Sequence, residues 1–292
     1  MENLFHPNHD SINPDREFSP EGSKEWTNFK YHERLRRLSK LIINLSDSNF
    51  EAPSLVAFAE IESKQVLEDL LQNQPIRKLN YQLVHYDSPD RRGIDVGLIY
   101  RKDQLKLLNS IAIPYFCDSI PDYHSRDMLY ASFTNFKGDT LQFVINHWPS
   151  RYGGQEASQF KRLCASERLL KFTDSVKKIT KAPFILMGDF NDSPIDSSLQ
   201  YLSSLGHFDN LMESLPKSLG SHRYKGEWSY LDQVLISKQY RANVQDYGVF
   251  SLPFLLEKES KYPGYRPKRA FRGTFFTDGF SDHLPIYLDW RP

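Results

Sequence analysis

Polar side chains that can bind metal ions or transfer protons lie at the ends of the apolar runs that the sequence predicts as strands. Because such side chains meet across loops at one edge of a sheet, we expect them to converge. Carboxylates with oxygen-rich neighbours and no thiolates suit Mg²⁺, Mn²⁺ or Ca²⁺ better than zinc. The residues concerned are Glu60, His147, Asp189, Asn191, Asp232, Asp282 and His283.

The dipeptide Asp282-His283 suggests how water could be activated at this edge. An aspartate beside a histidine, with a second aspartate able to orient the ring, is a general-base arrangement. A metal ion, an amide and an imidazole together match the negative charge that spreads over a phosphate ester as it reacts. The residues therefore favour metal-assisted hydrolysis, with phosphate esters as the preferred substrates.

Helices and short strands must position these side chains. Three- and four-residue apolar spacing predicts one helix through Trp26, Phe29, Leu35, Leu38, Ile42 and Leu45, and a second over 155–179 with Phe160, Leu163, Leu170 and Val176 on its apolar side. Strands are predicted at 55–59, 81–86, 95–100, 129–133, 141–146, 183–187, 231–236 and 284–288. Strands interspersed with helices predict sheets packed face to face with helices outside.

The composition limits the classes of protein to which the chain can belong. It has 292 residues, with 37 Lys plus Arg and 37 Asp plus Glu, so the formal net charge is zero. That balance argues against bulk coating of nucleic acid and against a polybasic membrane binder. We find no apolar run long enough to span a bilayer, no linker and no repeat, and we expect a single domain over 1–292 with no obligate protein partner.

Seven motifs occur in an order that resembles a known family. They are AEIE at 59–62, RRGIDVGLIYR at 91–101, SRDMLY at 125–130, NHWPSR at 146–151, GDFND at 188–192, YLDQVLIS at 230–237 and SDHLP at 281–285. The sequence resembles the deoxyribonuclease-like endonuclease/exonuclease/phosphatase superfamily over nearly its whole length, and within it a bacterial branch. The resemblance implies an α/β (α+β) fold, a four-layer α/β/β/α sandwich of two mixed, mainly antiparallel sheets.

The resemblance also implies roles for individual residues. Glu60 would be the main metal carboxylate, with Asp282 and Glu2 facing the same Mg²⁺ or Mn²⁺, and Ca²⁺ as a further candidate. His283, paired with Asp232, would act on the attacking water or on the scissile phosphate. The remaining roles are orientation or deprotonation of water by Asp189, a hydrogen bond to the phosphoryl oxygen from Asn191, and phosphate contacts from His147 and Arg126.

One departure from the family pattern concerns the start of the chain. Family members open with a strand that ends in Asn-x-(Asp/Glu); Glu2 fits the acidic position, but the Asn would lie before Met1. We expect that the first strand is missing from this sequence. As the sequence stands it predicts a cytoplasmic protein, whereas a truncated N-terminus would allow a periplasmic or secreted one. Cys117 and Cys164 form no C-x-x-C pair, and one bridge between them stays open.

Simpler interpretations compete with several of these roles. Asp189 and Asn191 could be turn residues, His147 alone could be a structural histidine, and Arg151 could be either a phosphate contact or a surface charge. Asp10 and Asp15 could bind a second ion, although solvated loop acids are the simpler interpretation. The remaining candidates for merely structural or exposed side chains are Glu62, His85, His124, His207 and His222.

The stretch 258–272 combines six basic residues and one Glu with Tyr262, Tyr265 and Phe271. A cationic aromatic loop can bind phosphates and stack bases, and this one runs towards Asp282. We therefore predict a metal-dependent phosphoesterase that cleaves phosphodiesters, with nucleic acid as a candidate partner. The alternatives are a phosphomonoesterase, a lipid phosphodiesterase, and a non-catalytic binding protein on a degenerate nuclease fold.

Overall fold

The structure, a computed structural model, describes residues 1–9, 16–46, 51–205 and 207–291; Asp10 and Asp15 lie outside this part. The helices are α1 (Asn28–Asn44), α2 (Lys64–Leu71), α3 (Gln155–Lys177) and α4 (Ser197–Ser204). The strands are β1 (Leu55–Ile61), β2 (Tyr81–His85), β3 (Asp95–Arg101), β4 (Leu105–Ile113), β5 (Met128–Asn135), β6 (Thr140–His147), β7 (Phe184–Asp189), β8 (Phe208–Asn210), β9 (His222–Tyr224), β10 (Glu227–Ser229), β11 (Asp232–Ser237), β12 (Val244–Val249), β13 (Leu256–Lys258), β14 (Tyr265–Pro267), β15 (Phe271–Arg272), β16 (Phe275–Phe276) and β17 (Ile286–Trp290).

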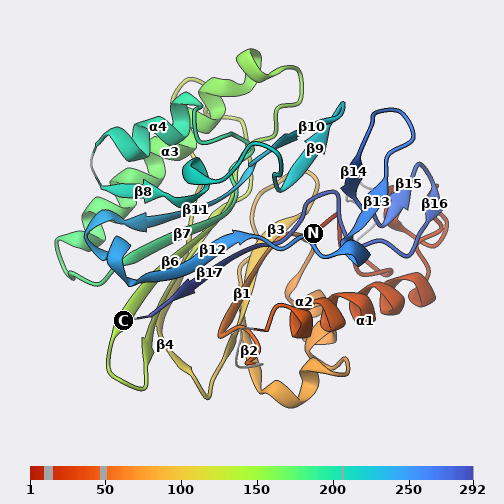
Figure 1. The fold of residues 1–292 in the computed structure, drawn as a ribbon, viewed down its shortest axis with the longest axis horizontal. Helices are drawn as coiled ribbons and strands as arrows, with labels where there is room; N and C mark the ends of the chain where they lie inside the picture. Colours follow the sequence, from red (N-terminus) through yellow and green to blue (C-terminus); the bar gives the residue numbers. More distant parts are fainter. Residues whose placement is uncertain (10–15, 47–50, 206, 292) are drawn as a thin grey trace.

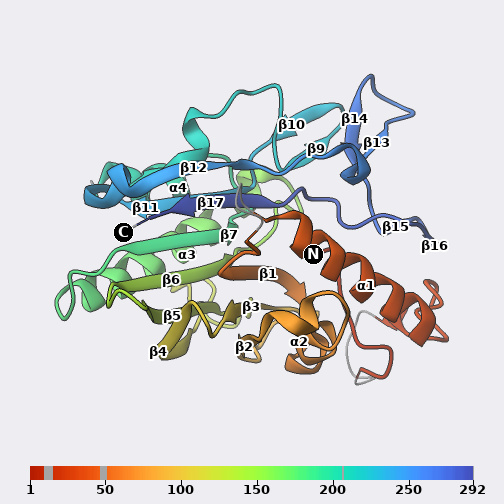
Figure 2. The same cartoon turned by 60° about the horizontal axis from the view of Figure 1, so that its bottom comes forward.

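Two main sheets form the middle of the molecule (Figures 1 and 2). One has six strands in the order β4-β5-β6-β7-β11-β8, and the other has three in the order β1-β3-β2. Neighbouring strands are antiparallel except β6 and β7, which are parallel and joined through α3. The separate β12–β17 pair lies on the same side of the six-stranded sheet as β1. Three further hairpins pair β9 with β10, β13 with β14, and β15 with β16.

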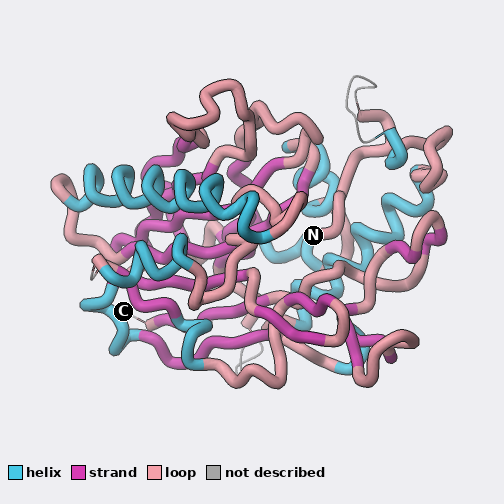
Figure 3. Tube along the Cα trace, turned by 90° about the horizontal axis from the view of Figure 1, so that it is seen from above, coloured by secondary structure: helices cyan, strands magenta, loops and turns pink. Residues whose placement is uncertain are grey.

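The alternation of side chains along the central strands produces the layers. In β6, Phe143 and Ile145 face a core shared with Leu98 of β3, whereas Val144 faces a second core with Leu169 of α3. A third core lies between α1, α2 and the three-stranded sheet. Helices therefore cover the outer face of each sheet, as Figure 3 shows from above. The predicted four-layer α/β/β/α sandwich is confirmed.

Helix α1 has an N-cap at Thr27, whose hydroxyl accepts a hydrogen bond from the backbone N–H of Lys30, and it buries Leu35, Leu38 and Ile42 as predicted. The predicted apolar faces of α1 and α3 were nevertheless wrong at one residue each, because Phe29 and Phe160 are exposed. Their positions lie outside the buried stripe of each helix. The buried face of α3 consists largely of small and polar residues and one arginine: Ser158, Arg162, Ala165, Ser166, Leu169, Leu170 and Thr173.

The predicted strands are all present, with shifts of at most two residues at their ends. The sequence prediction missed β4, an edge strand, β12, and the strands of two or three residues. It also missed the short helices α2 and α4, which are too brief to show a clear period. Cys117 and Cys164 form a disulfide that joins the segment before β5 to α3. In the part of the chain that the structure describes, every helix is too short or too polar to cross a membrane.

The first residues lie along the end of β1. Leu4 forms a parallel bridge with Ile61, and the terminal ammonium group of Met1 donates a hydrogen bond to the carbonyl of Ala59 at 2.8 Å. This arrangement brings Glu2 next to the end of β1. The single domain over 1–292 and the missing first strand stay predictions.

Candidate active site

Three of the predicted site residues lie side by side because of strand register. His147 ends β6 and is the register partner of Asp189 at the end of β7. Asp189 is in turn directly opposite Asp232, the first residue of β11. The three side chains therefore stand in a row across neighbouring strands at one edge of the six-stranded sheet.

A glycine allows the strands to approach closely at this edge. Gly188 has a φ of 129°, and a Cβ atom built on it would lie 2.1 Å from the carbonyl oxygen of Asn146. A side chain at this position would push β6 and β7 apart, so the GD pair of the GDFND motif is a packing requirement as well as a chemical one.

His283 joins this row from the loop before β17. Its Nδ1 lies 2.6 Å from Oδ2 of Asp232, and its backbone N–H donates to the hydroxyl of Ser281. Burial alone would lower the pKa of His283, but the Asp232 carboxylate, with help from Asp189 and Asp282, raises that pKa to about 10. The ring is therefore an imidazolium at neutral pH. Asp189, Asp232 and His283 offer ligand or proton-transfer atoms within 4.8 Å of one another.

Asp189 is held by its neighbour Asn191. The backbone N–H of Asn191 donates to Oδ1 of Asp189 at 2.8 Å, and the Asn191 amide donates to the carbonyl of Trp148 at 2.9 Å and to Oδ2 of Asp189 at 3.3 Å. Burial raises the pKa of Asp189 to about 7. In this arrangement Asn191 orients Asp189, and the predicted hydrogen bond from Asn191 to a phosphoryl oxygen stays a prediction. We call Asp189, Asn191, Asp232 and His283 the His283 group.

His147 is buried at the end of β6. Its side chain is 2% exposed, and its Nε2 lies 3.8 Å from Oδ2 of Asp189. Burial, and next the positive charge of Arg126, hold the pKa of His147 well below its usual range. The ring is thus neutral and faces Asp189, and its predicted phosphate contact stays a prediction.

The three predicted metal ligands, Glu2, Glu60 and Asp282, form a second cluster that we call the acidic group. Glu2 and Asp282 are bridged by Arg269, whose Nη2 lies 2.9 Å from Oε1 of Glu2 and 3.1 Å from Oδ2 of Asp282. The backbone N–H of Ala270 donates to Oε2 of Glu2 at 2.8 Å. Burial raises the pKa of Glu2, and the nearby Asp282 carboxylate raises it further.

Glu60 lies at a bulge near the end of β1. Its φ is 63°, in the left-handed region, and the pairing of β1 with β3 shifts register there. Its Oε2 accepts a hydrogen bond from the backbone N–H of Asn3 at 2.9 Å, and its Oε1 lies 3.9 Å from Arg92. The left-handed residue re-aims the side chain at the strand end, as bulges next to active sites commonly do.

Two members of the acidic group already share one cation. A single guanidinium nitrogen, Nη2 of Arg269, contacts both Glu2 and Asp282. Both are oxygen ligands of the kind that Mg²⁺ and Mn²⁺ prefer. The charge of Glu60 acts on Asp189 and on Arg269, which places it in the same electrostatic neighbourhood.

The structure orients Arg126 and Arg151 towards the protein itself. Arg126 donates to Asp90 at 3.1 Å and to the carbonyl of Trp148 at 2.8 Å. Arg151 donates to the carbonyl of Asn191 at 2.7 Å and to Asp196 at 2.7 Å. Arg126 is a neighbour of His147, but its predicted phosphate contact stays a prediction, while Arg151 supports the backbone of the Asn191 loop.

A buried ion pair anchors the same loop to α3. Nε of Arg162 lies 2.7 Å from Oδ1 of Asp192, and both side chains are 0% exposed. Asp192 also accepts a hydrogen bond from the hydroxyl of Ser198 at 2.6 Å, and the Arg162 guanidinium donates to Ser158 at 2.9 Å. This network fixes the residues that immediately follow Asp189 and Asn191.

Three residues of the site escaped the sequence analysis. The ring of His222, interpreted there as structural or exposed, lies 4.7 Å from the ring of His283. Arg34 is fully buried, and its charge faces Glu2, Glu60 and Asp282. Arg269 had a signal, because it lies in the basic stretch that runs into Asp282, whereas Arg34 sits in an amphipathic helix and had none.

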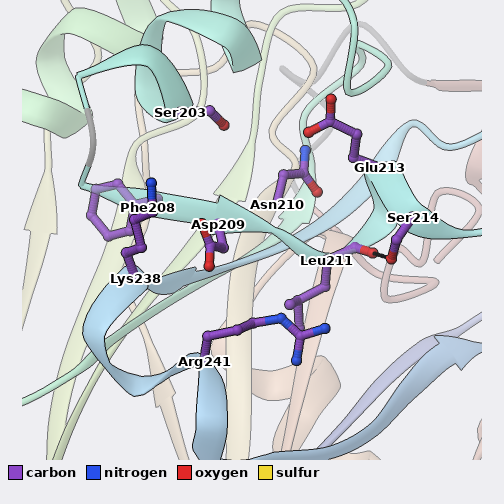
Figure 4. Close-up of a pocket in the computed structure, with 9 residues that line it drawn as sticks. All are labelled: Ser203, Phe208, Asp209, Asn210, Leu211, Glu213, Ser214, Lys238 and Arg241. Carbon is purple, nitrogen blue, oxygen red and sulfur yellow. Dashed lines mark hydrogen bonds between the residues drawn. The ribbon is translucent and has the colours of Figure 1, made fainter.

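Two other places in the structure have features of a site but contain none of the predicted site residues. His85, Asp87 and Asp95 bring ligand atoms within 4.8 Å of one another, with Nδ1 of His85 3.8 Å from Asp87 and its Nε2 3.4 Å from Asp95. A surface hollow of about 450 Å³ lies along β8, between Asp209, Glu213 and Arg241. Figure 4 shows that both charge signs line it, and none of the predicted site residues does.

Comparison with known proteins supports the assignment of the fold. The sequence model of the Endonuclease/Exonuclease/phosphatase family matches residues 1–291, and a search of curated proteins found no match. The structure resembles the human Nocturnin catalytic domain with bound sulfate, at 17% identity and a TM-score of 0.57, over 89% of this chain and 87% of that one.

Two further solved structures show the same fold. A mannosyl-6-phosphatase of Bacteroides thetaiotaomicron is 16% identical, with a TM-score of 0.60, over 88% of this chain and 90% of that one. TDP2 of D. rerio, complexed with a single-strand DNA product, is 17% identical, with a TM-score of 0.58, over 88% and 91%. At these identities the likeness establishes the fold and leaves the substrate open.

Proposed function

The chain belongs to the endonuclease/exonuclease/phosphatase family, and from this premise we propose that it is a divalent-metal-dependent phosphoesterase that cleaves phosphodiester bonds. The observation that carries the proposal is the row of His147, Asp189 and Asp232 on adjacent strands, with His283 bonded to Asp232. Two acids and an imidazolium with fixed orientation are the parts that activation of water and stabilisation of a phosphoryl group require.

The acidic group would hold the metal ion. Glu2 and Asp282, which already share one cationic side chain, and Glu60 beside them would provide its carboxylate ligands. When bound, Mg²⁺ or Mn²⁺ would supply Lewis-acid stabilisation of the charge that develops on the phosphoryl and leaving oxygens.

Asp189 is the residue that we assign to the attacking water. Its raised pKa suits a base near neutral pH, and its carboxylate is held by Asn191. The water oxygen would form a bond to phosphorus in line with the ester bond that breaks. One proton of the water would pass to Asp189, and the leaving alkoxide would take up a proton from solvent. Because water attacks phosphorus directly, no covalent enzyme intermediate forms.

His283 would act as a cation towards the phosphate. Its ring is charged because it is bonded to Asp232, so it can donate a hydrogen bond to a phosphoryl oxygen through Nε2 but cannot accept a proton from water. Asp232 would fix the ring and stabilise its charge, a positioning role rather than a direct contact.

The charges at the site favour a diester over a monoester. Arg269, Arg92 and Arg126 each contact a carboxylate, and none is placed as a free cation for a second phosphate charge. A diester carries one negative charge and a monoester carries close to two at neutral pH. Because these arginines are already paired with carboxylates, the site suits the single negative charge of a diester.

Turnover of small reporters tests the proposal. We expect hydrolysis of bis-p-nitrophenyl phosphate with Mg²⁺ or Mn²⁺, no hydrolysis in EDTA, and slower hydrolysis of p-nitrophenyl phosphate. Asp189→Ala should remove the activity, while Asp118→Ala, on an exposed loop, should keep it. Faster turnover of the monoester would favour a phosphatase, and no turnover of either reporter would favour a binding protein.

A further inference from the structure

Two hairpins form an arm beside the site. The arm comprises residues 222–229, which carry β9 and β10, and residues 256–267, which carry β13 and β14. Figures 1 and 2 show the two hairpins side by side. They are far apart in the sequence, so their contact is a product of the fold.

Arg223 locks the two hairpins together. Its side chain is 5% exposed and pairs with Glu259 at 2.8 Å. It also donates to the carbonyls of Tyr265 at 2.9 Å and Pro263 at 2.6 Å, across the gap between the hairpins, and to Gly226 at 3.1 Å within its own turn. Charge-assisted hydrogen bonds of this kind make the arm a built platform rather than two independent surface loops.

Glycines let the hairpins meet closely. A Cβ atom on Gly264, where φ is 112°, would lie 3.1 Å from the Arg223 guanidinium, and one on Gly226, where φ is 88°, would lie 3.0 Å from Tyr262. Both positions therefore favour glycine for backbone and packing reasons together. The turns that carry the exposed side chains of the arm are thus fixed in shape.

The arm presents aromatic rings and uncompensated cations to solvent. Tyr224 is 65% exposed and Tyr265 is 60% exposed. The Lys225 ammonium lies 5.3 Å from the ring of Tyr224, and in strand register Lys258 is the partner of Tyr265. Within the described part of the chain, no carboxylate lies within ion-pair distance of Lys225, Lys258 or Lys261.

The arm is joined directly to the His283 group. His222 of β9 forms an isolated bridge with His283, and their rings lie 4.7 Å apart. Tyr224 is two residues further along β9, so its side chain is on the same face as that of His222 and about 7 Å away along the strand. A chain-like substrate with its reacting phosphate at His283 would meet Tyr224 next.

We propose that the arm binds the unpaired nucleotides of a single-stranded nucleic acid next to the scissile phosphate, with Tyr224 and Tyr265 stacking on bases and Lys225, Lys258 and Lys261 facing phosphates. Alternating aromatic rings and cations match the alternation of bases and phosphates in a single strand. The inference rests on the proposed function, since it places the substrate of that same site.

The residues at the tips of the arm distinguish this partner from a lipid surface. The two turns contain Lys225-Gly226 and Ser260-Lys261-Tyr262-Pro263-Gly264, without an aliphatic side chain that could insert into a bilayer. A membrane-binding surface needs such apolar side chains beside its basic ones. A base needs a flat ring, which both tyrosines provide.

Fluorescence anisotropy with a labelled single-stranded 12-mer of mixed sequence, in EDTA to prevent cleavage, tests the arm. We expect Tyr224→Ala to weaken binding by about 5- to 150-fold, as expected for loss of one stacked base, and Tyr265→Ala to act in the same direction. Lys225→Gln should lower the slope of log affinity against log salt by about 0.7. Because binding is measured without turnover, this experiment can fail while the reporter assay succeeds, and the reverse.

The chain contains a matched control. Phe136-Lys137-Gly138 repeats the aromatic-Lys-Gly order of the Tyr224 turn in the β5–β6 hairpin, with Phe136 77% exposed and Gly138 at a φ of 89°. That hairpin is at the opposite end of β6 from His147, so Phe136→Ala should leave binding unchanged. Three results would each overturn the inference. The first is an equal effect of Phe136→Ala and Tyr224→Ala, and the second is no binding by the wild type in about 50 mM salt. The third is Tyr224-dependent binding to phosphatidylserine vesicles without binding to the 12-mer.

Discussion

The His283 group and the acidic group are built differently. Most of the His283 group stands on or just after adjacent strands of the six-stranded sheet, at Asp189, Asn191 and Asp232. The acidic group comes from three segments distant in the sequence, at Glu2, Glu60 and Asp282. The first group is fixed by strand register and by hydrogen bonds among its own members. The second is held mainly by arginines, with Arg269 between Glu2 and Asp282 and Arg34 buried nearby.

The difference shows two ways to bring like charges together. In the His283 group, one imidazolium offsets the charge of two aspartates, and the surrounding packing holds all of them in place. In the acidic group, three carboxylates depend on cations contributed from elsewhere in the chain. We therefore expect mutations in the His283 group to lower the rate of hydrolysis, and mutations in its supporting loop to lower the free energy of unfolding. Mutations in the acidic group should change the affinity for the metal ion.

The largest effect is expected from His283→Ala. Loss of the charged ring should reduce turnover of bis-p-nitrophenyl phosphate by about 10²- to 10³-fold, the usual contribution of one preorganised hydrogen-bond donor to developing negative charge. His207→Ala, which changes a half-buried histidine away from the site, serves as the control. Retained turnover in the His283 variant would remove that residue from the mechanism.

Arg162→Met tests the support of the His283 group. It leaves Asp192 as a buried charge without its ion-pair partner and should lower the free energy of unfolding by about 3–5 kcal/mol, measured in urea. The exposed pair of Arg36 and Glu33 on α1 offers a comparison, because Arg36→Met should cost far less. Equal losses in the two variants would mean that the buried pair does not anchor the loop.

Glu60→Gln tests the acidic group. Removing one negative charge that faces a divalent ion should raise the dissociation constant for Mn²⁺ by about 10- to 100-fold, measured by calorimetry. Glu62→Gln is the matched control, since Glu62 is two residues away and accepts hydrogen bonds from the backbone of His6 and from Ser63. A larger effect at Glu62 than at Glu60 would contradict the assignment.

Arg269→Gln is expected to have the smallest effect and the opposite sign. The guanidinium competes with a metal ion for Glu2 and Asp282, so its neutral replacement should tighten Mn²⁺ binding by about tenfold or less. Calorimetry provides the measurement, with Arg272→Gln, which changes an exposed arginine of β15 three residues further along the chain, as the control. Weaker binding in the Arg269 variant would show that this residue supports the metal ligands rather than competing with the ion.

The strands of the fold were predictable because each is a local apolar run with a clear end. β4 and α2 were missed for a related reason: an edge strand and a helix of two turns leave weak periodic signals. The apolar face of α3 was predicted wrongly at Phe160. The buried side of that helix consists largely of small residues and of Arg162, whose ion-pair partner Asp192 lies in the Asn191 loop. An ion pair between separate segments leaves no mark on the periodicity of either.

The sequence by itself determined the family, the four-layer fold and the set of polar residues at strand ends, because the motifs and apolar runs that carry this information are local. Only the tertiary structure decided which of those residues meet. It paired His283 with Asp232, brought His222 and Arg269 into the site, and locked two remote hairpins into one arm through Arg223. These contacts depend on strand register, on packing between layers and on charges that compensate each other across long separations in the chain, and no local pattern encodes them.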